Sequence, residues 1–501
     1  SVDADGHEFL RTRGLIARFD EERTRELVRA GVPLEGQGGG IPGFPCYRTV
    51  EETFGSAQMI AAEHPNLATW IDVGDSWAKS VDAASGYDLF VLKLTQSSEP
   101  GPKPVFFASF AIHAREYATA ELGIRFAEFL VDAYGSDPDV TWLLDEHEVH
   151  LLLQANPDGR KEAEAGAAWR KNTNNDYCSN TDLRGADLNR NFEFEWGCCG
   201  GSSGQQCSEV FRGPTAASEP EIQALQDYVR SIFPDQRGPG PDDPAPDDAT
   251  GVAVDVHSFS ELVLWPWGFT SASSANAAAF ATLGRKVAFW NDYFPLELSE
   301  FTIADGSSAD FYYGDLGVAG LAFEIGTTFF QSCSSFEATV APQNIDALLF
   351  AAKVARTPYL TPAGPEAIGA AAAPATATAG DLVTVTATLD DTRFSTRNGV
   401  EPSQTIASAE AFVGSPWRPG AVAVPMVASD GTFDSDIETV EAVLDTAGLP
   451  VGRHLVYVRG TDAAGHTGVV SAAFLEIVEP QLLFADGFES GDTSAWEGVR
   501  P

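Results

Sequence analysis

Between residues 46 and 360, apolar runs of strand length alternate with segments of helical periodicity. Residues 114–135 have the pattern of a long amphipathic helix that ends at a glycine. The apolar composition of the runs is typical of strands covered on both faces of a sheet. Repeated alternation of this kind restricts the fold to an α/β sandwich around a mixed sheet. We expect its strands at residues 68–74, 87–95, 104–112 and 149–156.

The pattern changes after residue 360. Residues 361–380 are rich in Ala, Thr and Pro without periodicity, which predicts a linker. Short alternating strands with turn residues between them follow, and this spacing favours an all-β sandwich that looks like an immunoglobulin-like accessory module. The expected division is an N-terminal arm or pro-region remnant (1–42), an α/β domain (43–360), the linker (361–380), the β domain (381–480) and a tail (481–501).

The charge balance argues against several classes of partner. The chain has 31 Lys and Arg against 72 Asp and Glu, a net charge of −41. It should therefore repel nucleic acid and anionic membranes, although the acidity also fits a solubility or high-salt adaptation or scattered calcium ligands. No apolar run reaches the roughly 18 residues of a membrane-spanning helix. No signal peptide is visible at Ser1, so we interpret the chain as a processed mature form.

The chain has six cysteines, an even number, and none of them forms a Cys-x-x-Cys pair. This favours disulfides and an oxidising, extracellular compartment. Fifteen pairings are possible, and a Cys-rich metal site is the alternative. Four cysteines crowd into residues 178–207, where disulfides would staple one long loop. The six are Cys46, Cys178, Cys198, Cys199, Cys207 and Cys333.

Three separated residues suggest a metal site. His113 and Glu116 form a His-x-x-Glu pair, and one helical turn would place both on one face of a helix. His257 follows an apolar run far downstream and could complete a set of two His and one Glu. Such a set leaves a fourth position open for water, which is typical of catalytic zinc. The remaining histidines offer no competing set, namely His7, His64, His147, His150, His454 and His466.

The segments around these residues resemble those of the funnelin (M14) zinc carboxypeptidases, the family of carboxypeptidases A, B and T. The match runs from about residue 46 to 359, with its motifs in the family's order: HAREYATAE, NPDG, WRK, DLNRNF, HS and FEIG. The resemblance implies one catalytic zinc held by His113, Glu116 and His257. It makes Glu324 the general base for a zinc-bound water, and its apolar neighbours should raise its pKa. Calcium is possible but is not predicted.

The same resemblance assigns the other site residues. Asp187 would hydrogen-bond a ligand histidine, and Arg170 would polarise the scissile carbonyl and stabilise the oxyanion. Asn189 and Arg190 would bind the free C-terminal carboxylate of the substrate, and Arg115 would line its path. We therefore expect a secreted bacterial metallocarboxypeptidase, monomeric, that acts on peptide or protein C-termini.

The sequence departs from the family at the mobile tyrosine, whose position falls on Thr302; Tyr312 or Tyr313 could substitute for it. The position that is acidic in carboxypeptidases for basic residues falls on Ala309, and Ser307 is also neutral. This favours apolar or small C-terminal side chains, unless the nearby Asp305 faces the pocket.

Two other functions remain as alternatives. A zinc amidase acting on cell-wall or amide-capped peptides would use the same water chemistry, but the intact Asn189-Arg190 pair favours a free carboxylate. A non-catalytic peptide-binding protein of the same fold would be expected to lack Glu324 or a metal ligand, and neither is lost.

Overall fold

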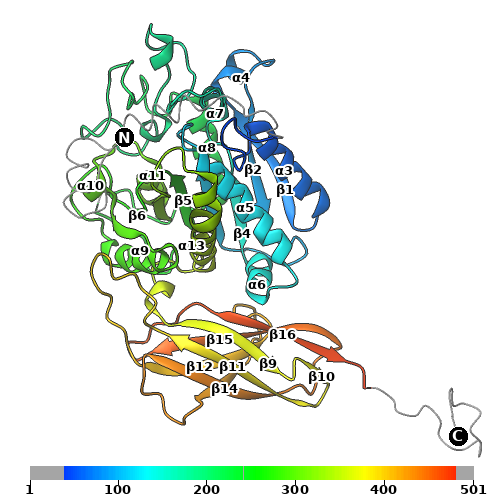
Figure 1. Cartoon of the computed structure of the whole chain (residues 1–501). Coiled ribbons are helices and arrows are strands. Elements are labelled where there is room, and N and C mark those ends of the chain that lie inside the picture. The colour runs from blue at the N-terminus through cyan, green and yellow to red at the C-terminus, as the bar shows by residue number, and fades with distance from the viewer. Residues whose placement is uncertain (1–38, 241, 481–501) are drawn as a thin grey trace, which may run out of the picture.

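The computed structural model describes residues 39–240 and 242–480. The expected tail and most of the expected N-terminal arm lie outside these residues. Two eight-stranded sheets organise the described chain (Figure 1). We refer to residues 39–363, which contain the first sheet and its helices, as the α/β unit, and to residues 364–480 as the β unit.

The first sheet is mixed, as predicted. Its strand order is β1-β2-β4-β3-β5-β8-β6-β7. Strand β3 pairs in parallel with β4 and β5, and β5 pairs in parallel with β8, whereas β1 and β2 add antiparallel pairs at one edge. The strands are β1 (Ala68–Asp75), β2 (Asp88–Leu94), β3 (Val105–Phe110), β4 (Glu148–Leu152), β5 (Val252–His257), β6 (Leu262–Trp265), β7 (Phe294–Glu297) and β8 (Ala319–Glu324).

Helices cover both faces of this sheet (Figure 1). Alternate residues of β3 show this directly, because Phe106 packs in the cluster that contains α5 and α13, whereas Phe107 packs in the cluster that contains α8 and α11. The helices are α3 (Val50–Glu63), α4 (Trp77–Val81), α5 (Tyr117–Ala133), α6 (Pro138–Glu146), α7 (Pro157–Glu164), α8 (Pro220–Ile232), α9 (Ala277–Asn291), α10 (Leu298–Phe301), α11 (Ser308–Leu316), α12 (Cys333–Ser335) and α13 (Ala341–Lys353), with short turns η1 (Thr181–Leu183), η2 (Leu188–Arg190), η3 (Phe336–Val340) and η4 (Thr361–Ala363).

Local sequence signals explain where several helices begin. Thr49 and Glu52 form a reciprocal capping box at the start of α3. Asp137 accepts hydrogen bonds from the first backbone N–H groups of α6, which has Pro138 at its first position. Asn156 caps α7 in the same way, again ahead of a proline.

All six cysteines form disulfides: Cys46–Cys333, Cys178–Cys207 and Cys198–Cys199. The first joins the start of the α/β unit to α12. The other two lie in the long segment between α7 and α8, as the crowding of four cysteines indicated. The alternative of a Cys-rich metal site is wrong, because disulfide sulfurs are not available as thiolate ligands.

The β unit has the strand order β10-β16-β15-β12-β13-β14-β11-β9. Along β11 buried and more exposed residues alternate, with Val383, Val385, Ala387 and Leu389 facing the core. Residues of β11 and of β15 enter one buried cluster, so the strands form two packed layers. The strands are β9 (Glu366–Ala373), β10 (Thr376–Thr378), β11 (Leu382–Asp390), β12 (Ile406–Val413), β13 (Ala423–Ala428), β14 (Ile437–Asp445), β15 (Gly452–Asp462) and β16 (Ser471–Val478).

The prediction that residues 361–380 form an irregular linker is wrong. Strands β9 and β10 lie there, and β9 pairs with β11. The alanines of β9 are too small to give the alternation of large apolar and polar residues that identifies a strand in a sequence.

The β unit packs against α6, and ion pairs of Arg285 and Lys286 join it to α9 (Figure 1). Tyr457 of β15 joins the large cluster of the α/β unit, and Trp417 lies 5.5 Å from Trp142 of α6 between ring centroids. Arg418 forms an ion pair with Glu146 at the end of α6. Because α6 leads into the start of β4, the β unit lies at the amino-terminal ends of the parallel strands.

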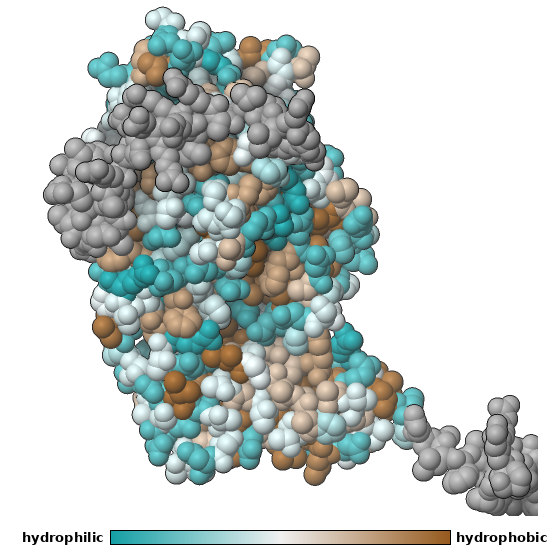
Figure 2. All heavy atoms as spheres, in the orientation of Figure 1, coloured by the Kyte–Doolittle hydropathy of each residue, from teal (hydrophilic) through white to brown (hydrophobic). Residues whose placement is uncertain are grey.

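Exposed apolar side chains are scattered over the described surface. On the face in Figure 2, apolar side chains are interspersed with hydrophilic ones. Several of the exposed large apolar side chains belong to the β unit, including Leu382, Val427 and Val443. Within the described ranges, no helix combines the length and the apolar character needed to cross a membrane.

Candidate metal centre and active site

The three expected ligands meet at the carboxyl ends of the central strands. His113 lies in the turn after β3, His257 is the last residue of β5, and Glu116 is the N-cap of α5. Strands β3 and β5 are parallel neighbours, so their carboxyl ends share one edge of the sheet. Ligand sites of open α/β sheets occupy this edge.

The expectation that His113 and Glu116 lie one turn apart on a helix is wrong. The two residues stand in the turn that precedes α5, where the Glu116 N–H donates to the His113 carbonyl at 3.2 Å. The hydrogen bond of this turn links residues three apart in the sequence. The turn therefore brings the two side chains together as one turn of a helix would, although the backbone is not helical.

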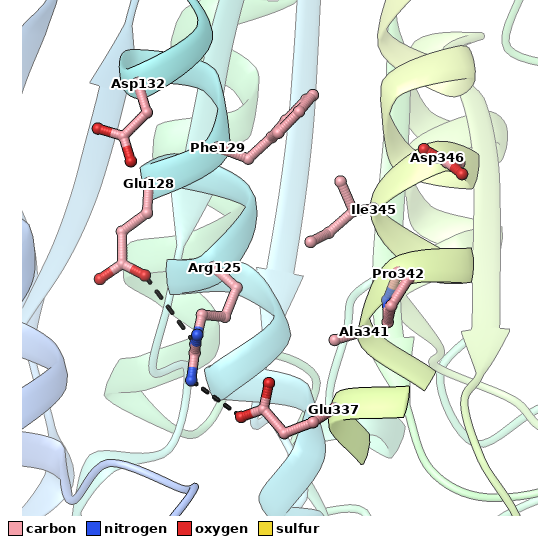
Figure 3. Close-up of a pocket in the computed structure, with 9 residues that line it drawn as sticks. All are labelled: Arg125, Glu128, Phe129, Asp132, Glu337, Ala341, Pro342, Ile345 and Asp346. Carbon is pink, nitrogen blue, oxygen red and sulfur yellow. Dashed lines mark hydrogen bonds and ion pairs between the residues drawn. The ribbon is translucent and has the colours of Figure 1, made fainter. Parts of the chain in front are cut away.

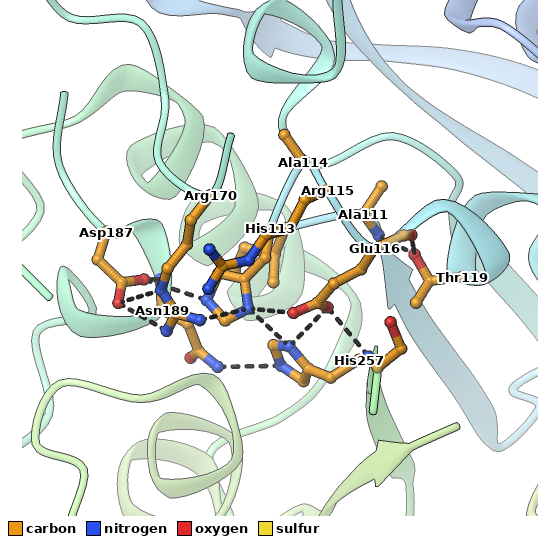
Figure 4. Close-up of polar contacts among 12 residues, drawn as sticks. Ala111, His113, Ala114, Arg115, Glu116, Thr119, Arg170, Asp187, Asn189 and His257 are labelled. Atoms are coloured by element: carbon orange, nitrogen blue, oxygen red, sulfur yellow. Dashed lines mark hydrogen bonds and ion pairs between the residues drawn. The ribbon is translucent and has the colours of Figure 1, made fainter. Parts of the chain in front are cut away.

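Potential ligand atoms of His113, Glu116 and His257 converge beside this turn (Figure 4). The two Nδ1 atoms of His113 and His257 are 3.1 Å apart. Glu116 Oε1 lies 2.9 Å from Nδ1 of His113, and Glu116 Oε2 lies 3.3 Å from Nδ1 of His257. All three side chains are buried.

A carboxylate lies behind each imidazole ring. His113 Nε2 is 3.1 Å from Asp187 Oδ1, and His257 Nε2 is 2.9 Å from Asp255 Oδ2. A carboxylate only accepts, so each Nε2 carries the proton and donates it, and each Nδ1 turns a lone pair toward the centre. Two imidazole nitrogens and a carboxylate oxygen that converge in this way fit the preferences of Zn²⁺, and the contacts of Nε2 are those that fix a metal-binding tautomer.

The sequence analysis missed Asp255. It precedes His257 by two residues on β5, so the period of a strand places both side chains on one face. This spacing was available in the sequence as VDVH. Ser109 and Ser308 donate further hydrogen bonds to the Asp255 carboxylate, at 2.8 and 2.6 Å.

Glu324 ends β8 beside the metal-ligand set. Its Cα pairs with that of His257 across β5 and β8. Burial raises the pKa of Glu324 to about 7, and the negative charge of Glu116 adds to this shift, whereas His257 opposes it. Among the described residues no side chain forms a hydrogen bond or ion pair with the Glu324 carboxylate. A carboxylate that forms no hydrogen bond with the described residues is able to take a proton from a bound molecule.

Arg170 is oriented by Asp187. Its Nε and Nη2 both donate to Asp187 Oδ2, at 3.0 and 2.8 Å, and Nη1 lies 3.3 Å from His113 Nδ1. Burial would raise the pKa of Asp187, but Arg170 and His113 outweigh it and hold this pKa well below its usual range. Asp187 therefore stays ionised and fixes both the imidazole and the guanidinium.

Asn189 and Arg190 lie next to this pair in η2. Asn189 Oδ1 accepts from the Ser308 N–H at 2.8 Å, and its Nδ2 lies 3.0 Å from His257 Nε2. The side chain of Arg190 is buried, yet among the described residues no carboxylate lies within ion-pair distance of it. A buried guanidinium that forms no ion pair with the described residues is suited to bind an incoming carboxylate.

Arg115 also lies near the site but is already engaged. Its guanidinium lies 4.3 Å from the centre of the Phe329 ring, and Nη1 is 3.5 Å from Glu209 Oε2. The Glu209 side chain is 47% exposed, so this ion pair lies next to solvent. Arg115 therefore lies beside His113 and Glu116 (Figure 4), with its ion-pair partner half exposed.

The tyrosine substitution considered from the sequence is wrong. Tyr312 and Tyr313 are fully buried in α11, and the Tyr313 hydroxyl donates to Asn276 at 2.7 Å. Thr302 follows α10 at the surface, where its hydroxyl reaches only a neighbouring carbonyl. Neither buried ring can move over a substrate without opening the core.

The pocket candidates beside α11 are buried. Ala309 belongs to an apolar cluster with Leu264, Phe301 and Ala322. Asp305 is fully buried, and its Oδ2 accepts from the N–H groups of Cys199 and Gly201. Its other oxygen is also buried, so Asp305 presents no carboxylate oxygen to solvent.

A separate depression lies between α5 and α13 (Figure 3). Its lining includes Glu128, Glu337 and Asp346, and Arg125 pairs with Glu337 at 3.0 Å. No expected site residue lines it. It is therefore distinct from the metal centre.

A family model and several known proteins are similar to this chain. The model of the zinc carboxypeptidase family, M14, matches residues 56–340, more than half of the chain. The chain is 32% identical over 300 residues to a zinc carboxypeptidase of Saccharothrix mutabilis subsp. capreolus, covering 56% of this chain and 62% of that protein. It is 30% identical over 232 residues to carboxypeptidase A1 of Bos taurus, covering 46% of this chain and 49% of that protein.

Solved structures show the same fold. The crystal structure of thrombin activatable fibrinolysis inhibitor aligns with a TM-score of 0.55 and 22% identity, over 66% of this chain and 80% of that one. Carboxypeptidase A from Helicoverpa armigera aligns with a TM-score of 0.53 and 22% identity, over 69% and 85%. The chain spans about half to three-fifths of the length of the curated relatives it matches. The chain belongs to the zinc carboxypeptidase family.

Proposed function

We propose that this protein is a zinc metallocarboxypeptidase that hydrolyses the C-terminal peptide bond of peptides or proteins. One observation carries the proposal: two imidazole nitrogens and a carboxylate converge beside Glu324, whose own carboxylate has no hydrogen-bond partner among the described residues. His113, Glu116 and His257 would hold the zinc. The bound zinc would make a water molecule acidic enough to act as a nucleophile at neutral pH and would polarise the carbonyl.

The protein's own residues would carry the remaining steps. Glu324 takes a proton from the attacking water and returns it to the leaving amine. Arg170, held by Asp187, directs Nη1 toward the site and stabilises the developing oxyanion. Asn189 and Arg190 bind the terminal carboxylate, which aligns the last peptide bond with the reacting groups.

We propose that the enzyme prefers apolar or small C-terminal side chains. Ala309 and its cluster neighbours are apolar, and Ser307 is neutral. Asp305 does not expose an oxygen to a basic side chain, because one oxygen binds backbone N–H groups and the other, which has no hydrogen-bond partner among the described residues, is buried. Arg115 would contact residues that precede the terminal one.

We also propose an extracellular location and an accessory role for the β unit. Three disulfides are typical of proteins from oxidising compartments. The two strand layers of the β unit favour an immunoglobulin-like sandwich. Its position at the amino-terminal ends of the parallel strands, away from the metal ligands, supports a structural role rather than a part in catalysis.

The test uses N-blocked dipeptides with a free or an amidated C-terminus, assayed as purified, after chelation and after return of zinc. We expect cleavage of the free acids, loss of that activity on chelation and recovery with about one zinc per chain. Preferential cleavage of the amidated peptides would instead favour an amidase. Zinc binding without cleavage of any peptide would favour a non-catalytic peptide-binding protein.

A further inference from the structure

Two backbone carbonyls aim the guanidinium of Arg190. Its Nε donates to the Gly201 carbonyl at 2.9 Å, and Nη1 donates to the Asn189 carbonyl at 2.6 Å. Nη2 has no hydrogen-bond partner in the described parts of the chain. The direction in which Nη2 points therefore depends on where the Gly201 carbonyl is held.

Gly201 belongs to a loop that we call the disulfide loop, residues 197–204, with Cys198 and Cys199 at its tip. A bond between adjacent cysteines closes a small ring, which restricts the backbone at that tip. The bond between Cys178 and Cys207 ties the chain just after the loop. Both crosslinks reduce the number of conformations that the loop can adopt.

Asp305 attaches this loop to the body of the α/β unit. Its Oδ2 accepts from the N–H groups of Cys199 and Gly201, at 3.1 and 2.9 Å. The loop docks closely there, since a Cβ on Gly201 would lie 2.6 Å from the Cα of Ala304. Asp305 is fully buried, so solvent does not compete for these hydrogen bonds.

We propose that Asp305 is a positioning residue for substrate binding, which acts through the disulfide loop to hold Arg190 toward the terminal carboxylate of a peptide. The proposal rests on the proposed role of Arg190. Gly201 links the two side chains. Its N–H donates to the Asp305 carboxylate, and its carbonyl accepts from Arg190. The absence of an aromatic ring at Thr302 leaves more of the alignment of the substrate to this arrangement.

A second contact supports the coupling. A Cβ on Gly306, the residue after Asp305, would lie 2.6 Å from the carbonyl oxygen of Arg190, so the two segments touch directly. The backbone of Gly306 has a φ of +66°, which a side chain would disfavour. The segment around Asp305 therefore contacts Arg190 both through the loop and along its own backbone.

The experiment compares Asp305→Ala, Asp305→Asn, Arg190→Ala and the double variant Asp305→Ala/Arg190→Ala, using free-acid dipeptides. Asp305→Ala should raise KM about tenfold and change kcat less than about threefold, since the reacting groups stay in place. Asp305→Asn keeps an acceptor oxygen and should restore most of the affinity. In the double variant KM should equal that of Arg190→Ala, because Asp305 acts only through that side chain.

Zinc content and the melting temperature identify variants that fold. Asp243→Ala is the matched control, because Asp243 also accepts from a glycine N–H, at Gly240, but has no contact with Arg190. This control should leave KM unchanged. If Asp305→Ala does not fold, Cys198→Ser/Cys199→Ser opens the tip of the loop while Asp305 remains, and its KM should rise in the same way.

The proposal is overturned if folded Asp305→Ala has the wild-type KM, or if its effect on KM adds to that of Arg190→Ala. Where Asp305→Ala does not fold, an unchanged KM in Cys198→Ser/Cys199→Ser overturns the proposal. Failure of the proposed function gives a different result. In that case the wild-type protein does not cleave free-acid peptides, or Arg190→Ala leaves their KM unchanged.

Discussion

His257 and Glu324 are register partners at the carboxyl ends of β5 and β8. The Ile325 N–H, one residue beyond Glu324, donates to the His257 carbonyl at 2.7 Å. A metal-ligand candidate and the candidate base are thus held by one backbone ladder rather than by loops. The distance between the two residues is set by the strand backbone. A substitution of the Glu324 side chain should therefore leave the metal ligands in place.

Glu324→Gln should keep the fold and the zinc but lose most turnover. Gln has nearly the same shape and cannot take a proton, and loss of a general base costs on the order of 10²–10⁴-fold in kcat. The measurements are kcat on a free-acid dipeptide and the zinc content. Near-native kcat in a zinc-loaded variant would assign the base to another group.

Arg190→Ala should weaken the use of free-acid peptides by roughly 1.5–3 kcal/mol in kcat/KM, the scale of a hydrogen bond to a charged group. Amidated peptides lack the carboxylate, so their slower cleavage should change little. The comparison is kcat/KM for the two peptide types. Equal losses on both would show that Arg190 supports the structure or the oxyanion.

Asp255→Asn should lower the affinity for zinc by about 10- to 100-fold, because it weakens the contact that orients His257. Competition with a chromophoric chelator measures the affinity without reference to activity. Asp391→Asn is a suitable control, since Asp391 is also buried but lies in the β unit. Unchanged zinc affinity in Asp255→Asn would mean that the strand alone orients the ring.

Glu221→Gln should reduce the loss of stability between pH 5 and pH 8. Burial raises the pKa of Glu221 to about 8, and Glu219 adds to the shift. In this window the unfolded chain releases the proton while the folded chain keeps it, so stability falls by about 1.4 kcal/mol per pH unit for this group. Melting temperatures of wild type and variant at both pH values test this; parallel pH profiles would contradict it.

The sequence predicted the parts of the fold that depend on large apolar side chains. The four strands expected between residues 68 and 156 and the long helix after His113 are present, because their burial requires an apolar pattern that is visible in the residues. Strand β9 was missed because alanine leaves too little pattern. A helix was wrongly expected at His113, because a spacing of three residues brings side chains together in a turn as well as in a helix.

The candidate site divides in the same way. The sequence brought together His113, Glu116, His257 and Glu324 through motifs, and the structure places them at one edge of the sheet. Asp255 required the period of a strand to be applied beside a candidate ligand. The link from Asp305 to Arg190 passes through backbone N–H and carbonyl groups, and a sequence carries no side-chain signal for such contacts.

The Cys46–Cys333 bond closes a covalent ring that contains every proposed site residue, from His113 to Glu324. The exposed acidic residues Asp247 and Asp248 lie on this ring, between the stretch that supplies Arg190 and the stretch that supplies His257. A protease that cuts the chain there would leave both halves of the metal centre joined. The nicked protein would migrate as one chain until it is reduced, and then separate into two.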